Sequence, residues 1–106
     1  MRVISQEGTI DVPYEISSFS MAVGKYEDVE CAAIYCHNIS TTAGTKMAKY
    51  SRKEKAKEAM EELQYAYACH NTVMFNKEMA NDIPNDRMVK AIIGGVFQFP
   101  AEEELE

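Results

Sequence analysis

Residues 51–70 read SRKEKAKEAMEELQYAYACH, and this stretch decides the fold. Apolar and small side chains recur in it at three- and four-residue steps, the spacing that places side chains on one face of an α-helix. The opposite face is charged, with Lys57 and Glu61 four residues apart and Glu62 beside them. We therefore predict a long helix with one solvated face and one core-facing stripe. The stripe is Ala56, Ala59, Met60, Leu63, Ala66, Tyr67 and His70.

The two ends of this helix are marked differently. Ser51 and Glu54 match a capping box, which predicts the helix start. At the other end, the periodic pattern either stops near His70 or continues to Ala80. A second, shorter helix is predicted over residues 84–93, because a proline stands at its first position and a glycine pair follows its last.

The N-terminal residues have the pattern of a β-hairpin. Residues 2–5 and 9–14 have strand composition and flank a polar turn that ends in Gly8, a residue that tolerates positive φ. Pro13 lacks an amide donor, so the second run is expected at a sheet edge or at the end of a ladder.

Further strands complete an α+β fold. The run at residues 30–37, ECAAIYCH, is almost continuously apolar, which indicates a central strand. We predict an N-terminal antiparallel sheet packed on one long helix, followed by a second short helix and a C-terminal strand. Residues 1–100 would form a single domain and residues 101–106 an acidic tail, solvated and frayed. The other predicted strands are residues 16–23, 45–50 and 96–99.

The composition is that of one folded domain and favours a cytosolic protein. Of the 106 residues, 46% are hydrophobic and 26% are charged, and no apolar run approaches the roughly 18 residues that a membrane span needs. The first residues lack the long apolar region and cleavage site of a signal peptide. A net charge of −6 argues against binding to duplex nucleic acid, which requires a basic excess.

One cluster of basic residues stands out against this acidic balance. It can attract a small phosphate ligand, or it can be an ordinary solvated helix face, and the second interpretation is favoured. The cluster comprises Lys46, Lys49, Arg52, Lys53, Lys55 and Lys57.

The cysteines do not predict a metal site. The chain has three, and in a cytosolic protein reduced thiols are expected. Cys36-His37 and Cys69-His70 suggest zinc ligands, but neighbouring side chains of a strand point to opposite faces, so Cys36 and His37 cannot easily share an ion. We predict buried thiols and no bound metal.

No residue pattern predicts catalysis. The nucleophile-elbow motif is missing from the sequence, and Gly44-Thr45-Lys46 lacks the residue order of a phosphate-binding loop. The glycine pair at residues 94–95 precedes a strand, whereas a dinucleotide-binding fingerprint follows one. We therefore predict a protein that is not an enzyme, with no catalytic residues and no cofactor.

A binding module has better support, from the segment between His70 and Arg87. Nucleotide-like ligands are held by an aromatic face for the base, amides for the ribose and cations for the phosphates. The alternative is that the aromatic side chain is core and the amides form turns. The candidate ligand-binding residues are Phe75, Asn76, Asn85 and Arg87, with Lys25 able to complete the pocket from a neighbouring chain.

Three blocks of sequence together suggest a family. They are MRVISQEGTIDVPYE at residues 1–15, AKYSRKEKAKEAMEELQYAY at 48–67 and FQFPAEEELE at 97–106. These blocks resemble small phage-encoded proteins of the type I anti-Thoeris family, which are cyclic ADP-ribose sponges. Many relatives that share the blocks are uncharacterised.

The resemblance implies an immune-evasion protein in the cytoplasm of the infected bacterial host. Family members bind the glycocyclic ADP-ribose isomer made by host TIR-domain enzymes and hold it uncleaved, and some bind cyclic oligonucleotide signals in separate pockets. They form dimers that assemble into hexamers, so a homo-oligomer is expected here. The family pocket uses an aromatic residue, an asparagine and arginines, which Phe75, Asn85 and Arg87 match by type.

This chain also departs from the family pattern. Relatives can carry a basic residue in the FxFP strand, where this chain has Gln98. The pyrophosphate would then be met by Arg87, by a lysine such as Lys25 or by backbone amides. The alternative function is that of a phage accessory protein that binds a host protein.

Overall fold

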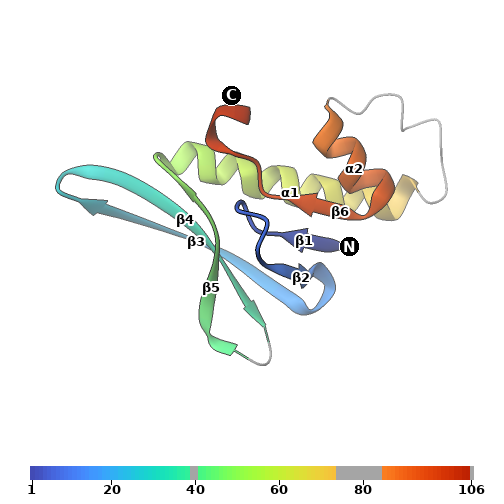
Figure 1. The fold of residues 1–106 in the computed structure, drawn as a ribbon, viewed down its shortest axis with the longest axis horizontal. Coiled ribbons are helices and arrows are strands. Elements are labelled where there is room, and N and C mark those ends of the chain that lie inside the picture. The colour runs from blue at the N-terminus through green and yellow to red at the C-terminus, as the bar shows by residue number, and fades with distance from the viewer. Residues whose placement is uncertain (39–40, 74–84, 106) are drawn as a thin grey trace.

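The structure is a computed structural model that describes residues 1–38, 41–73 and 85–105. It has the predicted α+β class (Figure 1). Short 3-10 turns at Tyr14–Ile16 and Glu102–Glu104 connect or follow the main elements. These elements are β1 (Arg2–Ile4), β2 (Asp11–Pro13), β3 (Ser17–Tyr26), β4 (Val29–Asn38), β5 (Thr41–Tyr50), α1 (Lys53–Val73), α2 (Asp86–Gly94) and β6 (Val96–Gln98).

The strands form two separate three-stranded sheets. The large sheet has the order β3-β4-β5 and is antiparallel, so the apolar run in β4 is central, as predicted. The small sheet has the order β2-β1-β6, with β1 antiparallel to β2 and parallel to β6. β2 lies at its edge, where the missing amide of Pro13 costs no ladder hydrogen bond.

The long helix α1 covers one face of the large sheet and also packs against α2. Ala56, Ala59, Leu63 and Ala66 are almost fully buried, which confirms the predicted stripe. The three alanines are small enough to allow α1 to lie close to Ala32, Ile34 and Cys36 of β4, which face the same core.

The start of α1 differs from the prediction of a capping box. The amide of Lys53 donates to Oε1 of Glu30 in β4 at 3.1 Å. Both the amide and the hydroxyl of Ser51 donate to Glu102. The start of the helix is therefore capped by partners that are distant in sequence, and the prediction of a local capping box between Ser51 and Glu54 is wrong.

The segment after α2 completes the core. Gly95 has a φ of 72°, which ends α2 in the left-handed conformation that glycine adopts without strain. Phe97 and Phe99 are buried with their ring centroids 5.4 Å apart, edge to face. Leu105 is only 6% exposed, so residues 102–105 dock on the domain and the expectation of a frayed tail is wrong here.

The hairpin of β3 and β4 extends away from the remainder of the domain (Figure 1). β3 continues through the predicted turn at Gly24 to Tyr26, and the chain reverses at Glu27 and Asp28, which have φ values of 51° and 65°. Positive φ at both central residues is the geometry of the tight turns that suit twisted hairpins. Neither helix of the described ranges is long and apolar enough to cross a membrane.

Candidate functional site

Asn85, a predicted ligand-binding residue, is the N-cap of α2. Its backbone is extended, and its Oδ1 accepts the amide of Met88 at 3.0 Å. This hydrogen bond satisfies one of the free amides of the first helical turn. It fixes the start of a helix whose Met88, Ala91 and Ile92 are buried. The side-chain carbonyl of Asn85 thus serves as a helix cap.

Replacing Asn85 can separate its capping role from the predicted ligand-binding role. We expect Asn85→Ala to lower the free energy of unfolding by about 1 kcal/mol, because the cap is lost. Asn85→Asp keeps an acceptor oxygen and is expected to retain most of that stability, yet it removes the amide donor. Urea denaturation measures the free energy of unfolding of each variant. A loss in Asn85→Asp as large as in Asn85→Ala would contradict the capping role.

Arg87, in the first turn of α2, forms ion pairs with two glutamates. Its Nη2 is 2.7 Å from Oε1 of Glu62 in α1, and its Nη1 is 3.9 Å from Oε2 of Glu104. Glu62 was expected on the solvated face of the helix, but its side chain is only 18% exposed and Arg87 covers it. Among the described residues, Nε of Arg87 and Oε2 of Glu62 are buried without a hydrogen-bond partner.

The electrostatics of this cluster limit what Arg87 can bind. Burial raises the pKa of Glu62 above its ordinary value of 4.5, and the nearby Arg87 guanidinium opposes that rise. The carboxyl groups of Glu62 and Glu104 both approach the one guanidinium of Arg87. An incoming phosphate must therefore displace a carboxylate, and Glu104, the more distant and more exposed of the two, is the weaker competitor.

Three distant segments meet beside Arg87, at the carbonyl of Pro100. It accepts a hydrogen bond from Nε2 of Gln6 at 3.1 Å and one from the hydroxyl of Tyr50 at 2.8 Å. Burial raises the pKa of the Tyr50 hydroxyl, which stays protonated and able to donate. A pocket of about 160 Å³ opens here, with polar atoms from Gln6, Arg87, Gln98 and Glu104.

The other predicted residues do not join this pocket within one chain. Lys25 pairs with Glu30 in register at the far end of the β3–β4 hairpin, and Figure 1 shows that end of the molecule opposite α2. Phe75 and Asn76 lie outside the described residues. Asn85 is two residues from Arg87 in sequence but does not line the pocket, so of the five predicted ligand-binding residues only Arg87 is found to line it in the described part of the chain.

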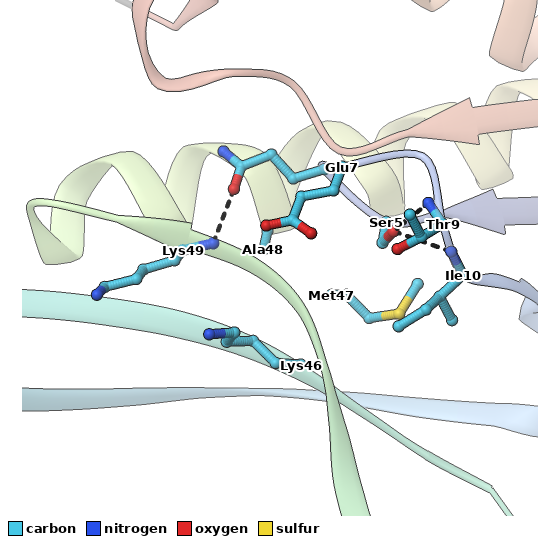
Figure 2. Close-up of a pocket in the computed structure, with 9 residues that line it drawn as sticks. Ser5, Glu7, Thr9, Ile10, Lys46, Met47, Ala48 and Lys49 are labelled. Atoms are coloured by element: carbon cyan, nitrogen blue, oxygen red, sulfur yellow. Dashed lines mark hydrogen bonds between the residues drawn. The ribbon is translucent and has the colours of Figure 1, made fainter.

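A second site is formed where the N-terminal turn meets β5 (Figure 2). The amide of Gln6 donates to the carbonyl of Met47 at 2.7 Å, and Oε1 of Gln6 accepts the amide of Lys49 at 3.0 Å. The hydroxyl of Ser5 accepts the amides of Thr9 and Ile10, so it holds the turn. The hollow between these segments measures about 130 Å³ and has Lys46 and Lys49 on its rim.

The basic cluster is therefore split between two elements. Lys46 and Lys49 belong to β5, whereas the rest of the cluster lies at the start of α1, where Nζ of Lys55 donates to the carbonyl of Leu105 at 2.7 Å. The prediction of one solvated helix face is wrong for Lys46 and Lys49. A regular strand also would not place Lys46 and Lys49 on the same face, because residues three apart in a strand point to opposite faces.

The described residues contain no group of three or more His, Cys, Asp or Glu side chains arranged to hold a metal ion. Cys36 faces the core while the neighbouring His37 lies on the other face of the sheet, where its Nε2 is 3.0 Å from the hydroxyl of Ser20.

In comparisons with known proteins, no family model, no curated protein and no solved structure matches this chain.

Proposed function

We propose that this chain is a phage immune-evasion protein that binds a cyclic nucleotide signal and sequesters it without cleaving it. The ligand is a glycocyclic ADP-ribose isomer, and cyclic oligonucleotides are a second class. The proposal rests on the resemblance of the three sequence blocks to cyclic ADP-ribose sponges. It places the protein in the cytoplasm of the infected bacterium, working as a homo-oligomer.

One observation carries the proposal furthest: the three blocks meet in space around Arg87. The first contributes Gln6 and the second contributes Tyr50, and both donate to Pro100 of the third. The second and third also supply the two carboxylates that hold Arg87, namely Glu62 and Glu104. The shared segments thus form one connected unit around a cation that the phosphates of a nucleotide require.

The size of the pocket determines how the ligand is held. Pockets that enclose small molecules typically measure about 300–1,000 Å³, whereas the space beside Arg87 is about 160 Å³. It accommodates the pyrophosphate region of the ligand and leaves the base and riboses outside. Phe75 and Asn76, or Lys25 of a second copy, would contact those parts. A contribution from Lys25 would require an assembly of chains, as the resemblance implies.

A capture experiment tests the proposal. The protein is mixed with the cyclic ADP-ribose isomer, the free ligand is separated by ultrafiltration, and the retained protein is then heated. We expect the filtrate to be depleted and the intact ligand to return on heating. A filtrate at full ligand concentration contradicts sequestration, and a ligand missing from both fractions indicates cleavage.

Variants of the same assay test the site. The pair Phe75→Ala and Arg87→Ala is expected to weaken capture at least about tenfold, since stacking and a charge-assisted contact are both lost. Arg87→Lys keeps the charge, which separates loss of binding from loss of folding. Lys90→Ala, on the exposed surface of α2, is the matched control. Unchanged capture by the pair places the ligand elsewhere.

The alternative function, binding to a host protein, is favoured by one observation. β3 is a ten-residue edge strand, and Val23 on β3 and Val29 on the adjoining strand are 47% and 65% exposed. Such an edge can pair with a strand of another chain. This function predicts a stable complex recovered from host lysate and no uptake of the cyclic nucleotide.

A further inference from the structure

One face of the large sheet is left open by the fold. The even-numbered residues of β4, such as Ala32 and Ile34, are buried beneath α1. The odd-numbered residues Cys31, Ala33 and Tyr35 face the other way and are only partly buried. In Figure 1, α1 lies on one side of β3, β4 and β5, and no described element covers the other side.

A β-bulge places two lysines on this open face. Tyr35 pairs with Lys46 and Ile34 pairs with Ala48, so the register shifts by one residue at Met47. Met47 and Ala48 are both buried, and Lys46 and Lys49 consequently emerge on the same side of β5. Figure 2 shows both side chains extending from β5 in the same direction. Their ladder partners are two residues apart, which separates the lysines by roughly 7 Å along the strand.

The lysines border a hollow that is lined largely by small residues. Its volume is about 340 Å³, and besides the two lysines it is lined by Ala22, Val23, Gly24, Cys31, Ala33 and Tyr35. A Cβ placed on Gly24 would meet no atom within 4 Å, so the space above the strand is open. This volume falls in the range of about 300–1,000 Å³ that is typical of pockets for small molecules.

The opposite end of the open face is closed by a fixed histidine. The ring of His37 lies over Gly44, where a Cβ would come within 2.6 Å of its Cε1 atom. The hydroxyl of Ser20 holds that ring at 3.0 Å. Because His37 is tied to its own sheet, the accessible part of the face is the region between Tyr35 and the two lysines.

Two lysine ammonium groups on this face are available to an anion. In the ranges that the structure covers, neither Lys46 nor Lys49 forms an ion pair. Two carboxylates near Lys49 keep their negative charge but are held by hydrogen bonds to other groups, Glu30 by the first amide of α1 and Glu102 by Ser51. Glu7 and Glu27 are exposed at the borders of the adjoining hollows and are the remaining competitors for the lysines.

We propose that this open sheet face binds a nucleoside monophosphate. Its phosphate lies between Lys46 and Lys49, whose ammonium groups serve as point charges for phosphate oxygens. Its base lies against the ring of Tyr35, over the small side chains that line the hollow. This site is distinct from the pocket at Arg87 and does not depend on the proposed function.

Titration with AMP, monitored by the amide signals in two-dimensional NMR, tests this site. We expect shifts confined to β3, β4 and β5, and an affinity at least about tenfold lower in Lys46→Gln/Lys49→Gln, because two charge-assisted contacts are lost. The matched control is Lys53→Gln/Lys57→Gln, which removes the same charge from the exposed start of α1 and is expected to bind AMP within about twofold of the wild type. Equal losses in the two double variants, or no shifts with AMP, overturn the proposal.

Further variants and partial ligands test where AMP binds and which of its groups are recognised. Gly24→Leu fills the hollow without changing a charge and is expected to abolish AMP binding, while Arg87→Lys is expected to leave it unchanged. Adenosine and inorganic phosphate should each bind at least tenfold more weakly than AMP, since each retains only half of the contacts. AMP binding that survives Gly24→Leu but is lost in Arg87→Lys would assign the ligand to the other pocket and contradict this inference.

Discussion

Replacing Phe97 by alanine is expected to lower the free energy of unfolding by about 3–5 kcal/mol. Phe97 is 1% exposed and packs edge to face on Phe99. In β6 it stands opposite Val3 of β1, which is fully buried. The variant therefore loses the transfer energy of a phenyl ring, an aromatic pair and the packing of two sheet strands. Domains of this size are stable by only about 5–15 kcal/mol, so the loss is a large part of the total.

Urea denaturation followed by circular dichroism measures this change as a fall in the midpoint. Gln98→Ala is the matched control, because Gln98 follows Phe97 in β6 but is exposed. The side-chain amide of Gln98 donates to the carbonyl of Ser5 at 3.3 Å. We expect Gln98→Ala to lower the free energy of unfolding by about 1 kcal/mol or less. A cost for Phe97→Ala no larger than that of the control would show that β6 does not hold the core together.

Replacing Arg87 by leucine is expected to destabilise the protein by about 2 kcal/mol at neutral pH. The guanidinium is the cation that covers Glu62, and both side chains retain about a fifth of their exposure. Removing one partner leaves a mostly buried carboxylate without a counter-charge, which costs more than the net contribution of the pair. The value is below that of fully buried pairs because water still reaches this one.

The loss in Arg87→Leu should depend on pH in a defined direction. Burial raises the folded-state pKa of Glu62 above 4.5, and removing Arg87 removes the effect that lowers it. Between 4.5 and the raised folded pKa, the folded state binds more protons than the unfolded state, so stability falls as the pH rises. Below 4.5 the carboxyl is protonated in both states and the penalty disappears. The deficit of Arg87→Leu should therefore shrink on acidification.

The double variant Glu62→Gln/Arg87→Leu removes the carboxylate as well. We expect it to recover most of the lost stability at neutral pH and to show no additional pH dependence between pH 4 and 7. Denaturation midpoints at several pH values distinguish these cases. An Arg87→Leu deficit that is the same at pH 4 and pH 8 would mean that Glu62 is not the group left uncompensated.

The elements with a strong local pattern were predictable from the sequence. The stripe that runs from Ala56 to Ala66 predicted α1, and the apolar run at residues 30–37 predicted the central strand β4. Gly8 and Gly95 both adopt positive φ, as their places in a turn and after a helix predicted. Each of these signals arises from neighbours in the chain.

The division into two sheets could not be predicted, because it depends on pairing between distant residues. β1 runs parallel to β6, and the residues that pair, such as Val3 and Phe97, are separated by almost the whole chain. Similarly, Ser51 and Glu54 matched a local capping motif, but Ser51 bonds to Glu102 instead. Local propensity does not reveal which distant partner will compete for a hydrogen bond.

The candidate site shows the same limit. Asn85 and Arg87 were selected by residue type, and the structure shows that each also holds the fold, one as a helix cap and the other in an ion pair. Lys46 and Lys49 share a face only because Met47 is an extra residue in the ladder. A bulge has no reliable signature in a single sequence, so these lysines were interpreted as part of a helix surface.

The parallel pairing of β1 with β6 also affects how the chain can fold during synthesis. Val3 is made before its partner Phe97, which follows only after residues 4–96 have been translated. Until then, β1 and β2 form an isolated hairpin, which is at best marginally stable. The large sheet and α1 can associate earlier, since their contacts are closer in sequence. The small sheet therefore closes only after residues 96–98 have been made, and a chain stalled before residue 96 would expose the apolar surface that Phe97 and Phe99 normally cover.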